Sequence, residues 1–590
     1  MTMIDLPAPT RQDRLKAAQE FIAGGQLDAA ETLLEDAGAT RDPDTLNARA
    51  ALALARRRTD HAFELLADAA TAYPDHAGLA ANLGIAHEML GHFDEAVICL
   101  ERASALAPQN EDLKLALAHA LLSRGDIEEA RAITETAVQR EPGNARAFLQ
   151  LGTIDLAMQD RASAEAALVR ALELAPDDAD TLRNLSALLV ERGRFEEALN
   201  LAERAHLRAP LDSAGLLQLA YCRAAAGLWL RAEAACRKLL AYAPAHLGAR
   251  EVLARVTIAR GEVDRGITEL TQFVRARKSD HAATLALARI LQLVGRFEEA
   301  LKLAEHVVRA MPGQETAAAL KMTLELTLGR FPAPEAVALP LMTRVIVPPT
   351  TGAFEFIALV RLINRLAAQQ VVRVVADLRY QSLLSQLAEQ VIPDEPTPQL
   401  SATPLQALLR LLPNDAQNIA DDVPYLRPAP ELYAQWRDAF AEFKRPLVGI
   451  VWDGGALGLS MEQIASLLPE DATPVSLVTD AQRHDMKRWS RPIDAGVHID
   501  SPAEMIAAIA NLDAVVGPDS FAVHIAGALG VPGVALVPRG YPWYWAPVDG
   551  RALWYPSFDV VAQERLGDWT GAIDAGRQRL IDILQAPVRD

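Results

Sequence analysis

Apolar and small residues recur at helical spacing through the first 330 residues, and the whole pattern repeats every 34 residues. One series is made of prolines, with a lysine in one slot: Pro74, Pro108, Pro142, Pro176, Pro210, Pro244, Lys278 and Pro312. A second is made of glycines, with one glutamine: Gly91, Gly125, Gln159, Gly193, Gly227, Gly261, Gly295 and Gly329. A third, five positions later, is made of alanines: Ala96, Ala130, Ala164, Ala198, Ala232 and Ala300. These series predict stacked helix pairs, with glycine in a turn of positive φ, alanine where two helices touch and proline after the second helix.

The units at 81–108 and 147–176 resemble the tetratricopeptide repeat. The resemblance implies an α-solenoid over residues 43–314, with a degenerate first repeat in residues 1–42 and a closing helix and linker in residues 315–340. Such repeats form a superhelix whose concave face, lined by the first helix of each pair, binds an extended or helical partner segment.

Amide side chains occupy one position of the first helices in several units, namely Asn82, Gln150, Asn184 and Gln218. Amides can bond the main chain of a bound peptide whatever its side chains are. The series resembles the asparagine ladder of the O-GlcNAc transferases, although Ala116 and Val252 interrupt it. We therefore expect these amides to bind an acceptor protein. The alternative is that amides are simply common on solvated helix faces.

After Gly329 the 34-residue period stops, and short apolar runs alternate with amphipathic helical segments. We expect strands at 343–349, 371–378, 446–455, 473–480, 496–500, 511–520 and 533–540. Strands that alternate with helices predict parallel sheets covered on both faces. Residues 341–590 are therefore predicted to form an α/β domain of two Rossmann-like lobes that face a cleft.

The stretch 513–532 is the most informative part of this domain, because a strand runs through Gly517-Pro518 into Asp519-Ser520 and directly into a helix of small residues. Free amides at a helix N-terminus, at the carboxyl end of a parallel strand, form a ready site for an anion. The alternative is that Asp519 or Ser520 only caps the helix, which is compatible with anion binding.

This stretch resembles the donor-site motif of GT-B glycosyltransferases related to the heptosyltransferases. The resemblance implies that Asp519, Ser520, His524 and Gly527 bind the phosphate of a nucleotide sugar. Four cations near the predicted cleft could each neutralise an anionic donor, namely Arg483, Lys487, Arg488 and Arg539. A lone histidine on an apolar helix is otherwise a packed or capping residue.

The same relatives often carry Gly-x-Gly-Asp after the first strand, where this chain has Gly352-Ala353-Phe354-Glu355. Glu355 could keep the role of the carboxylate and deprotonate an acceptor hydroxyl. It could equally be a solvated glutamate in the first turn of a helix.

The order of the domains resembles the alphaproteobacterial flagellin glycosyltransferases. That resemblance implies transfer of a nonulosonic acid from a CMP-linked donor to Ser or Thr of flagellin, without a metal or cofactor. Two alternatives stay open: an O-GlcNAc-type transferase that uses a UDP-sugar, and a repeat scaffold with an inactive GT-B domain.

The net charge of −19 argues against a nucleic-acid binder, although residues 201–330 carry +6 between segments of −15 and −10. Three cysteines do not make a disulfide framework or a metal cluster. The first residues do not resemble a leader peptide, and there is no run of 18 apolar residues. We therefore expect a cytoplasmic protein that does not bind membranes.

Overall fold

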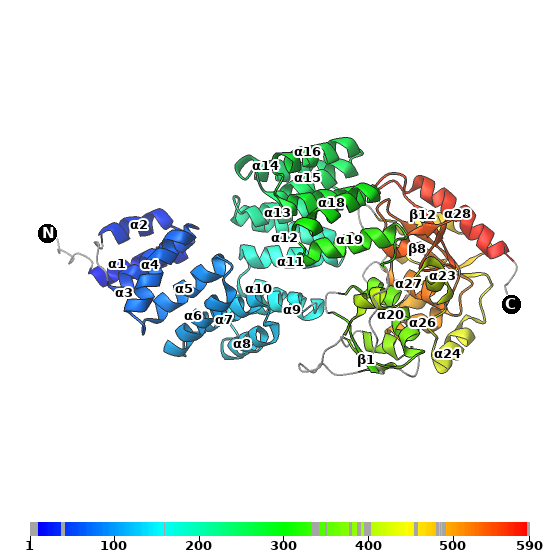
Figure 1. Cartoon of the computed structure of the whole chain (residues 1–590), viewed down its shortest axis with the longest axis horizontal. Helices are drawn as coiled ribbons and strands as arrows, with labels where there is room; N and C mark the ends of the chain where they lie inside the picture. Colours follow the sequence, from blue (N-terminus) through cyan, green and yellow to red (C-terminus); the bar gives the residue numbers. More distant parts are fainter. Residues whose placement is uncertain are drawn as a thin grey trace. The chain divides into compact units, whose positions relative to one another are not determined.

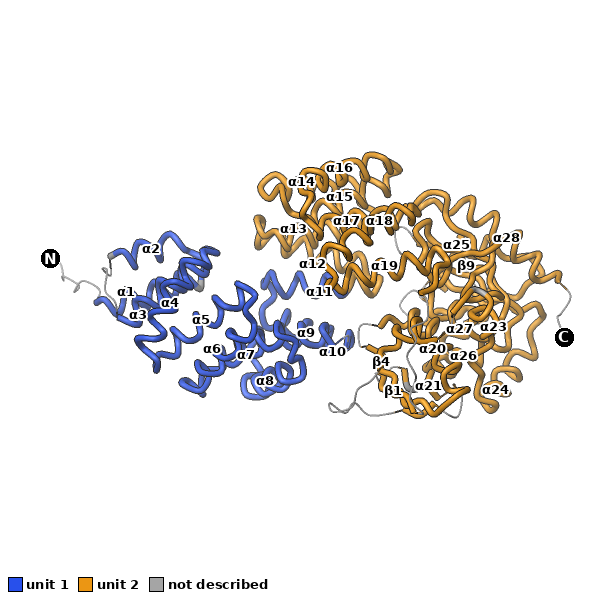
Figure 2. The backbone as a smooth tube through the Cα atoms, viewed as in Figure 1, with its two compact units in different colours: residues 1–188 blue, residues 189–590 orange. Residues whose placement is uncertain are grey.

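The computed structural model describes most of the 590-residue chain. The described residues are 10–36, 42–158, 160–332, 342–348, 351–376, 380–385, 387, 391–393, 403–412, 414–453, 458–479, 483, 485–486 and 491–586. Most of the predicted linker, residues 333–340, lies outside them. The chain forms two compact units, residues 1–188 and 189–590, and each is described by itself (Figure 2).

The first unit consists of paired antiparallel helices in chain order (Figure 1). They are α1 (Arg11–Ala23), α2 (Leu27–Asp36), α3 (Pro43–Ala55), α4 (Thr59–Ala72), α5 (Ala77–Met89), α6 (Phe93–Leu106), α7 (Glu111–Arg124), α8 (Ile127–Arg140), α9 (Ala145–Ala157) and α10 (Arg161–Leu174). The next helix, α11 (Ala179–Glu191), contains the boundary between the units. The helix pair α1–α2 occupies the place of the expected degenerate first repeat.

The second unit continues the same pairing before the α/β domain begins. Its repeat helices are α12 (Phe195–Arg208), α13 (Ser213–Ala225), α14 (Trp229–Tyr242), α15 (Leu247–Ala259), α16 (Val263–Ala276), α17 (His281–Leu293), α18 (Phe297–Ala310) and α19 (Glu315–Thr327). The last of these stands where a closing helix is expected.

The repeat residues have the conformations that their periodic positions predict. The period glycines from Gly91 to Gly329 have φ between 69° and 103°, apart from the slot at residue 159, which lies outside the described part. The period alanines are fully buried, as Ala96 and Ala300 illustrate. Small side chains therefore set the close approach of the helices within each pair.

The α/β domain contains two separate sheets. The first has the order β3-β2-β1-β4 and consists of β1 (Met342–Ile346), β2 (Val371–Val375), β3 (Val391–Pro393) and β4 (Thr403–Pro404), all parallel. Its main helix is α20 (Ala353–Ala367), which is buried through most of its length. The short helices around this sheet are α21 (Gln381–Leu384), α22 (Leu408–Leu411) and α23 (Ala416–Asp421).

The second sheet has the order β10-β11-β12-β9-β8-β5-β6-β7. Its strands are β5 (Leu447–Ile450), β6 (Thr473–Ser476), β7 (Ile493–Asp494), β8 (Ala514–Pro518), β9 (Gly533–Val537), β10 (Pro547–Val548), β11 (Arg551–Ala552) and β12 (Phe558–Ala562). The run from β12 to β7 is parallel, and β10 and β11 add an antiparallel edge. The helices of this part are α24 (Pro430–Phe440), α25 (Met461–Leu467), α26 (Pro502–Ile509), α27 (Phe521–Leu529) and α28 (Thr570–Gln585).

The parallel α/β prediction is confirmed, and one predicted strand is wrong. Residues 496–500 are not a strand, because the sheet pairing occurs at Ile493–Asp494 and a 3-10 helix follows at Ala495–Val497. Beyond residue 540, where no strand was predicted, β12 and the antiparallel strands β10 and β11 extend the sheet.

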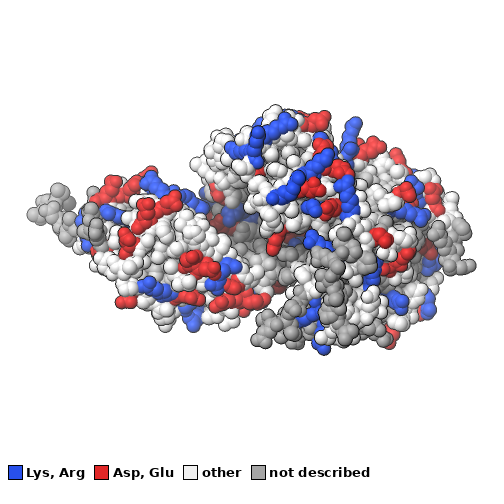
Figure 3. Space-filling model, in the orientation of Figure 1, with Lys and Arg blue, Asp and Glu red and all other residues white. Residues whose placement is uncertain are grey.

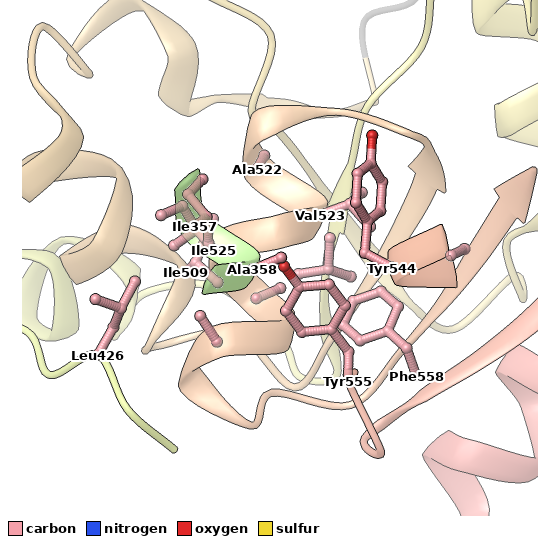
Figure 4. Packing of buried hydrophobic residues seen from close by; sticks show 14 of the residues in the cluster. Ile357, Ala358, Leu426, Ile509, Ala522, Val523, Ile525, Tyr544, Tyr555 and Phe558 are labelled. Carbon is pink, nitrogen blue, oxygen red and sulfur yellow. The ribbon is translucent and has the colours of Figure 1, made fainter. Parts of the chain in front are cut away.

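One hydrophobic core joins the two sheets and reaches the last repeat helix. The core includes α20 of the first sheet, α27 of the second and Leu326 of α19. Figure 4 shows Ile357 and Ala358 beside Ile525, with Tyr555 and Phe558 packed below them. The two parts of the α/β domain therefore share one interior.

Candidate functional site

The turn between β8 and α27 has the geometry that its sequence predicts. Ser520 is the N-cap residue in extended conformation, and its hydroxyl accepts a 3.4 Å hydrogen bond from the Val523 amide. Gly530 ends the helix with φ of 75°. The expected cap therefore exists, and the turn lies at the carboxyl end of a central parallel strand, where α/β folds bind ligands.

Asp519 is the acceptor for three side chains at this turn. Its carboxylate accepts hydrogen bonds from His524 Nε2 at 2.9 Å, Trp545 Nε1 at 2.8 Å and the Tyr544 hydroxyl at 3.3 Å. The His524 side chain is fully buried, whereas 21% of the Asp519 side chain is exposed. His524 therefore acts on the site through Asp519.

Behind His524, a chain of buried polar groups runs toward the first sheet. His524 Nδ1 lies 2.7 Å from the Tyr555 hydroxyl, so in the neutral ring Nε2 donates to Asp519 and Nδ1 accepts from Tyr555. Burial raises the pKa of the Tyr555 phenol, which keeps it protonated as a donor. The Tyr425 hydroxyl, which lies beside Tyr555, accepts a 3.1 Å hydrogen bond from the Arg361 guanidinium and donates one of 2.9 Å to the Ile357 carbonyl.

Arg361 belongs to α20 and is 1% exposed. Its guanidinium donates to the carbonyls of Ala358, Ile419 and Trp554 as well as to Tyr425. It also lies 4.4 Å from the centre of the Tyr425 ring. This arginine thus holds together segments that are far apart in the sequence and sets the positions of the rings behind His524.

The N-terminus of α20 lies beside the same turn. The Phe354 ring stacks on His524 with 4.8 Å between ring centres. Glu355 follows in the first turn and is half-buried, in contrast to the solvated alternative. Burial raises the pKa of the Glu355 carboxyl, and a hydrogen bond from Gln406 partly opposes that rise.

Two adjoining cavities, which we call the cleft, open at this place. The larger, about 700 Å³, is lined by Gly352–Glu355 and Tyr544 on one side and by residues of α15, α17 and α19 on the other. The second, about 570 Å³, is lined by Asp453, Asp519 and Trp569 and by residues of α11–α15 and α17. Repeat helices of the second unit thus form one wall of the cleft, and the carboxyl ends of β5, β8 and β9 contribute to the other.

Asp453 is a cleft residue that the sequence reasoning missed. It follows β5, and burial raises the pKa of its carboxyl, with the negative charge of Asp519 adding to the rise. Tyr544 and Trp545 were also missed as partners of Asp519, although the clustered rings at 541–555 were a visible signal.

The structure does not bring Arg539 into the cleft. Its Nε donates to the Val294 carbonyl at 2.9 Å, and its Nη1 donates to the Glu564 carbonyl. It lines a separate cavity of about 570 Å³. Gly527, in turn, has a packing role, because a Cβ at this position would lie 2.5 Å from the Tyr555 ring.

Most of the ladder amides bond the preceding repeat. Asn82 donates to Asn47 Oδ1 at 2.8 Å, and Gln150, which is 8% exposed, donates to the Leu115 carbonyl at 2.9 Å. Asn184 lies 3.4 Å from Thr153 Oγ1. Gln218 instead contacts Cys222 Sγ within its own helix, also at 3.4 Å. Acceptor binding by these four residues stays a prediction.

Within the described part of the chain, no group of His, Cys, Asp and Glu side chains could hold a metal ion. The helices described there are also too short or too polar to cross a bilayer.

Comparison with known proteins shows what the helix pairs are. Family models of the tetratricopeptide repeat match residues 53–119, 99–153 and 121–189, and further ones match residues 179–209 and 251–315. These segments are tetratricopeptide repeats, and the helix pairs continue this α-solenoid to α19.

Curated relatives cover less of the chain. Protein O-mannosyl-transferase TMTC1 of Homo sapiens is 30% identical over 129 residues, which is 22% of this chain and 14% of that protein. Cellulose synthase operon protein C of Xanthomonas axonopodis pv. citri is 30% identical over 180 residues, which is 30% of this chain and 10% of that protein. The chain therefore spans a small part of the length of both relatives.

Among solved structures, the APC/C hetero-tetramer Cut9–Hcn1 matches with 16% identity and a TM-score of 0.37, over 41% of this chain and 48% of that one. A human IFIT1 dimer matches with 18% identity and a TM-score of 0.33, over 50% of this chain and 81% of that one.

Proposed function

We propose that this protein is a protein O-glycosyltransferase of GT-B type whose donor is a nucleotide sugar. The observation that carries the proposal is the cleft, because the β8–α27 turn, the first turn of α20 and the repeat helices all line it or contact its lining residues. A cleft that is bordered by α20, by the carboxyl ends of β8 and β9 and by a tetratricopeptide-repeat solenoid suits transfer of a sugar to a protein, because such solenoids typically bind protein segments. The name of TMTC1, a protein O-mannosyl-transferase with sequence similarity to this chain, supports the coarser part of the proposal.

In this proposal the β8–α27 turn binds the donor phosphate through main-chain amides. The Ser520 and Phe521 amides begin α27, where the helix dipole favours an anion. The Asp519 carboxylate would repel a phosphate, so its role is to orient the turn and to accept hydrogen bonds from sugar hydroxyls. His524 fixes that carboxylate through its Nε2–H.

Glu355 is the proposed base. It takes the proton of an acceptor Ser or Thr hydroxyl as the hydroxyl oxygen forms a bond to the anomeric carbon. The bond between that carbon and the phosphate oxygen breaks, and the nucleotide leaves with the electron pair. A half-buried carboxyl with a raised pKa is a stronger base than an exposed one, which fits this role.

We further propose a CMP-linked nonulosonic acid as the donor and flagellin as the acceptor, held by the repeat solenoid. Concave repeat surfaces typically bind extended protein segments, which supports a protein acceptor. The donor and the acceptor otherwise follow from the resemblance in domain order to flagellin glycosyltransferases.

Intact-mass analysis of flagellin, co-expressed with this protein and a donor pathway, tests the proposal. We expect a mass increase of one or more nonulosonic acid residues, and unmodified flagellin would contradict the proposed acceptor. Titration with CMP- and UDP-linked sugars distinguishes the donors, and binding of neither class would favour a scaffold without catalytic activity.

The variants Asp519→Ala and His524→Ala should each abolish transfer, because each removes one partner of the carboxylate–imidazole hydrogen bond at the turn. The matched control is Asp574→Ala, which removes an exposed carboxylate of α28. Pull-down of flagellin through the repeats should be unchanged in all three. Full activity of both cleft variants would show that the donor site lies elsewhere.

A further inference from the structure

The repeat wall of the cleft is itself periodic. Tyr221, Arg255, Arg289 and Thr323 stand 34 residues apart, on α13, α15, α17 and α19, and each lines the cleft. Equivalent positions of consecutive repeats therefore present a row of side chains to the α/β domain. Two adjacent members of the row are arginines, and Arg255 lines both cavities.

These two arginines share a single carboxylate. The Glu251 oxygens accept hydrogen bonds from Arg289 at 3.0 and 3.2 Å, and Arg255 lies 3.7 Å from the same carboxylate. The side chains of Arg255 and Arg289 are 47% and 42% exposed, whereas that of Glu251 is 14% exposed. The group thus carries one uncompensated positive charge and leaves guanidinium donors that a ligand can use.

The opposite wall carries negative charge. Asp453, Asp519 and Glu355 line the cleft from the α/β domain, and Arg539 bonds main-chain carbonyls elsewhere. Among the described lining residues of the two cavities, the cationic side chains are Arg255 and Arg289. An anionic substrate in this cleft would therefore find its charge partner on the solenoid.

We propose that Arg255 and Arg289 form an oxyanion site that binds the donor substrate, so that the repeat solenoid completes the donor site. The ligand chemistry is a planar carboxylate or a phosphate, both of which match the fork of guanidinium donors. This inference rests on the proposed function, since the oxyanion is assigned to a nucleotide-sugar donor. Its two possible sources are the sugar carboxylate and the nucleotide phosphate.

The test is calorimetric titration of the full chain and of Arg255→Gln, Arg289→Gln and the double variant. The probes are CMP, which carries phosphate alone, N-acetylneuraminate, which carries a carboxylate alone, and CMP-N-acetylneuraminate and UDP-N-acetylglucosamine. Arg309→Gln is the matched control, because Arg309 is an exposed arginine of α18 that bonds the Glu305 carbonyl of its own helix. Circular dichroism checks that each variant is folded.

We expect each single variant to raise the Kd for the bound donor by about 10- to 100-fold, the usual effect of losing a charge-assisted hydrogen bond. Arg289→Gln also removes the closest partner of Glu251 and could therefore lower stability. In that case Arg255→Gln is the decisive variant, because the native Arg255 side chain makes the longer contact with Glu251. A raised Kd that is also seen with CMP would identify the nucleotide phosphate as the oxyanion that the arginines bind. A raised Kd confined to carboxylate-bearing ligands would identify the sugar carboxylate.

If the unmodified chain binds a probe and both arginine variants bind it with the same Kd, this inference is wrong and the proposed function stays intact. If the unmodified chain binds none of the four probes, both the inference and the proposed donor class are wrong.

Discussion

At the scale of single residues, the site depends on how buried polar groups are paired. Asp519 is partly exposed and receives three hydrogen bonds, while His524, Tyr555 and Arg361 behind it are buried. Buried polar groups of this kind are costly when a partner is removed, so they hold one arrangement of the rings. The exposed edge of the Asp519 carboxylate is thereby held in a fixed position at the cleft.

Glu355 predicts a pH effect on stability that does not depend on its catalytic role. Burial raises the pKa of its carboxyl above the ordinary value of 4.5, so folding favours the protonated form. Its contribution to stability is therefore present below the unfolded-state pKa and is lost as pH rises through the folded-state pKa. Urea denaturation should therefore show a smaller decline in unfolding free energy with rising pH for Glu355→Gln than for the unmodified chain.

Some decline in unfolding free energy with rising pH should remain in that variant, because burial also raises the pKa of the Asp453 carboxyl.

If Glu355 is the base, the rate of transfer should also fall as pH drops through its raised pKa. Glu355→Gln should then lower the plateau rate by about 10²- to 10⁴-fold. Identical pH profiles of stability for the two proteins would contradict the burial of this carboxyl.

Gly527 predicts a packing defect on substitution. Its missing side chain lets α27 contact the Tyr555 ring, and a Cβ there would lie 2.5 Å from a ring carbon. Gly527→Ala should therefore lower the free energy of unfolding by about 1–3 kcal/mol, the usual cost of overpacking a core. Gly571→Ala, at an open position of α28 with no atom within 4 Å of the added Cβ, is the control in the same denaturation assay.

At the scale of elements, the cleft exists because repeat helices of the second unit pack on loops of the α/β domain. A Cβ at Gly540 would lie 2.3 Å from the Gln292 carbonyl of α17, so only glycine permits this approach. Phe297 of α18 packs on Tyr541 with 5.1 Å between ring centres. The position of the arginine row relative to the α/β wall follows from these contacts.

Gly540→Ala should accordingly separate the two walls. Because the added methyl group meets backbone atoms that cannot rotate away, we expect a loss of about 1–3 kcal/mol in unfolding free energy. Hydrogen exchange of amides at the end of α17 should become faster. Gly313→Ala, whose Cβ would meet no atom within 4 Å, should leave both measurements unchanged.

At the scale of the whole molecule, the compact units do not coincide with the boundary between repeats and α/β domain. The second unit begins at residue 189 and contains repeat helices together with both sheets. Net charge does differ between the parts, since residues 1–200 carry −15, residues 201–330 carry +6 and residues 331–590 carry −10. Acidic and basic side chains both occur on the face seen in Figure 3.

This division predicts which fragments fold. A fragment of residues 177–590 keeps α11 and all later helices, so it should unfold cooperatively and keep donor binding. A fragment of residues 331–590 loses Leu326 from the shared core and exposes Tyr541 and Leu566, which pack against repeat residues. We expect the shorter fragment to aggregate or to bind a hydrophobic dye. A soluble, cooperatively folding fragment 331–590 would show that the repeats are not part of this folding unit.

The sequence by itself determined the elements that depend on local periodicity. The 34-residue series predicted the helix pairs, their glycine turns and their buried alanines, because each rule acts within a few tens of residues. It also predicted the β8–α27 turn, since a strand that runs into a capping residue and a helix of small residues is a local signal.

Only the tertiary structure decided what surrounds that turn. Asp453, Tyr544, Arg255 and Arg289 reach the cleft from distant segments, and Arg539 turns toward a repeat carbonyl instead. The 34-residue spacing of the arginine row was visible in the sequence. Which residues of the α/β domain face that row across the cleft was not. Burial and the pairing of distant polar groups are properties of the folded core, so the polarity of the cleft could not be inferred from spacing along the chain.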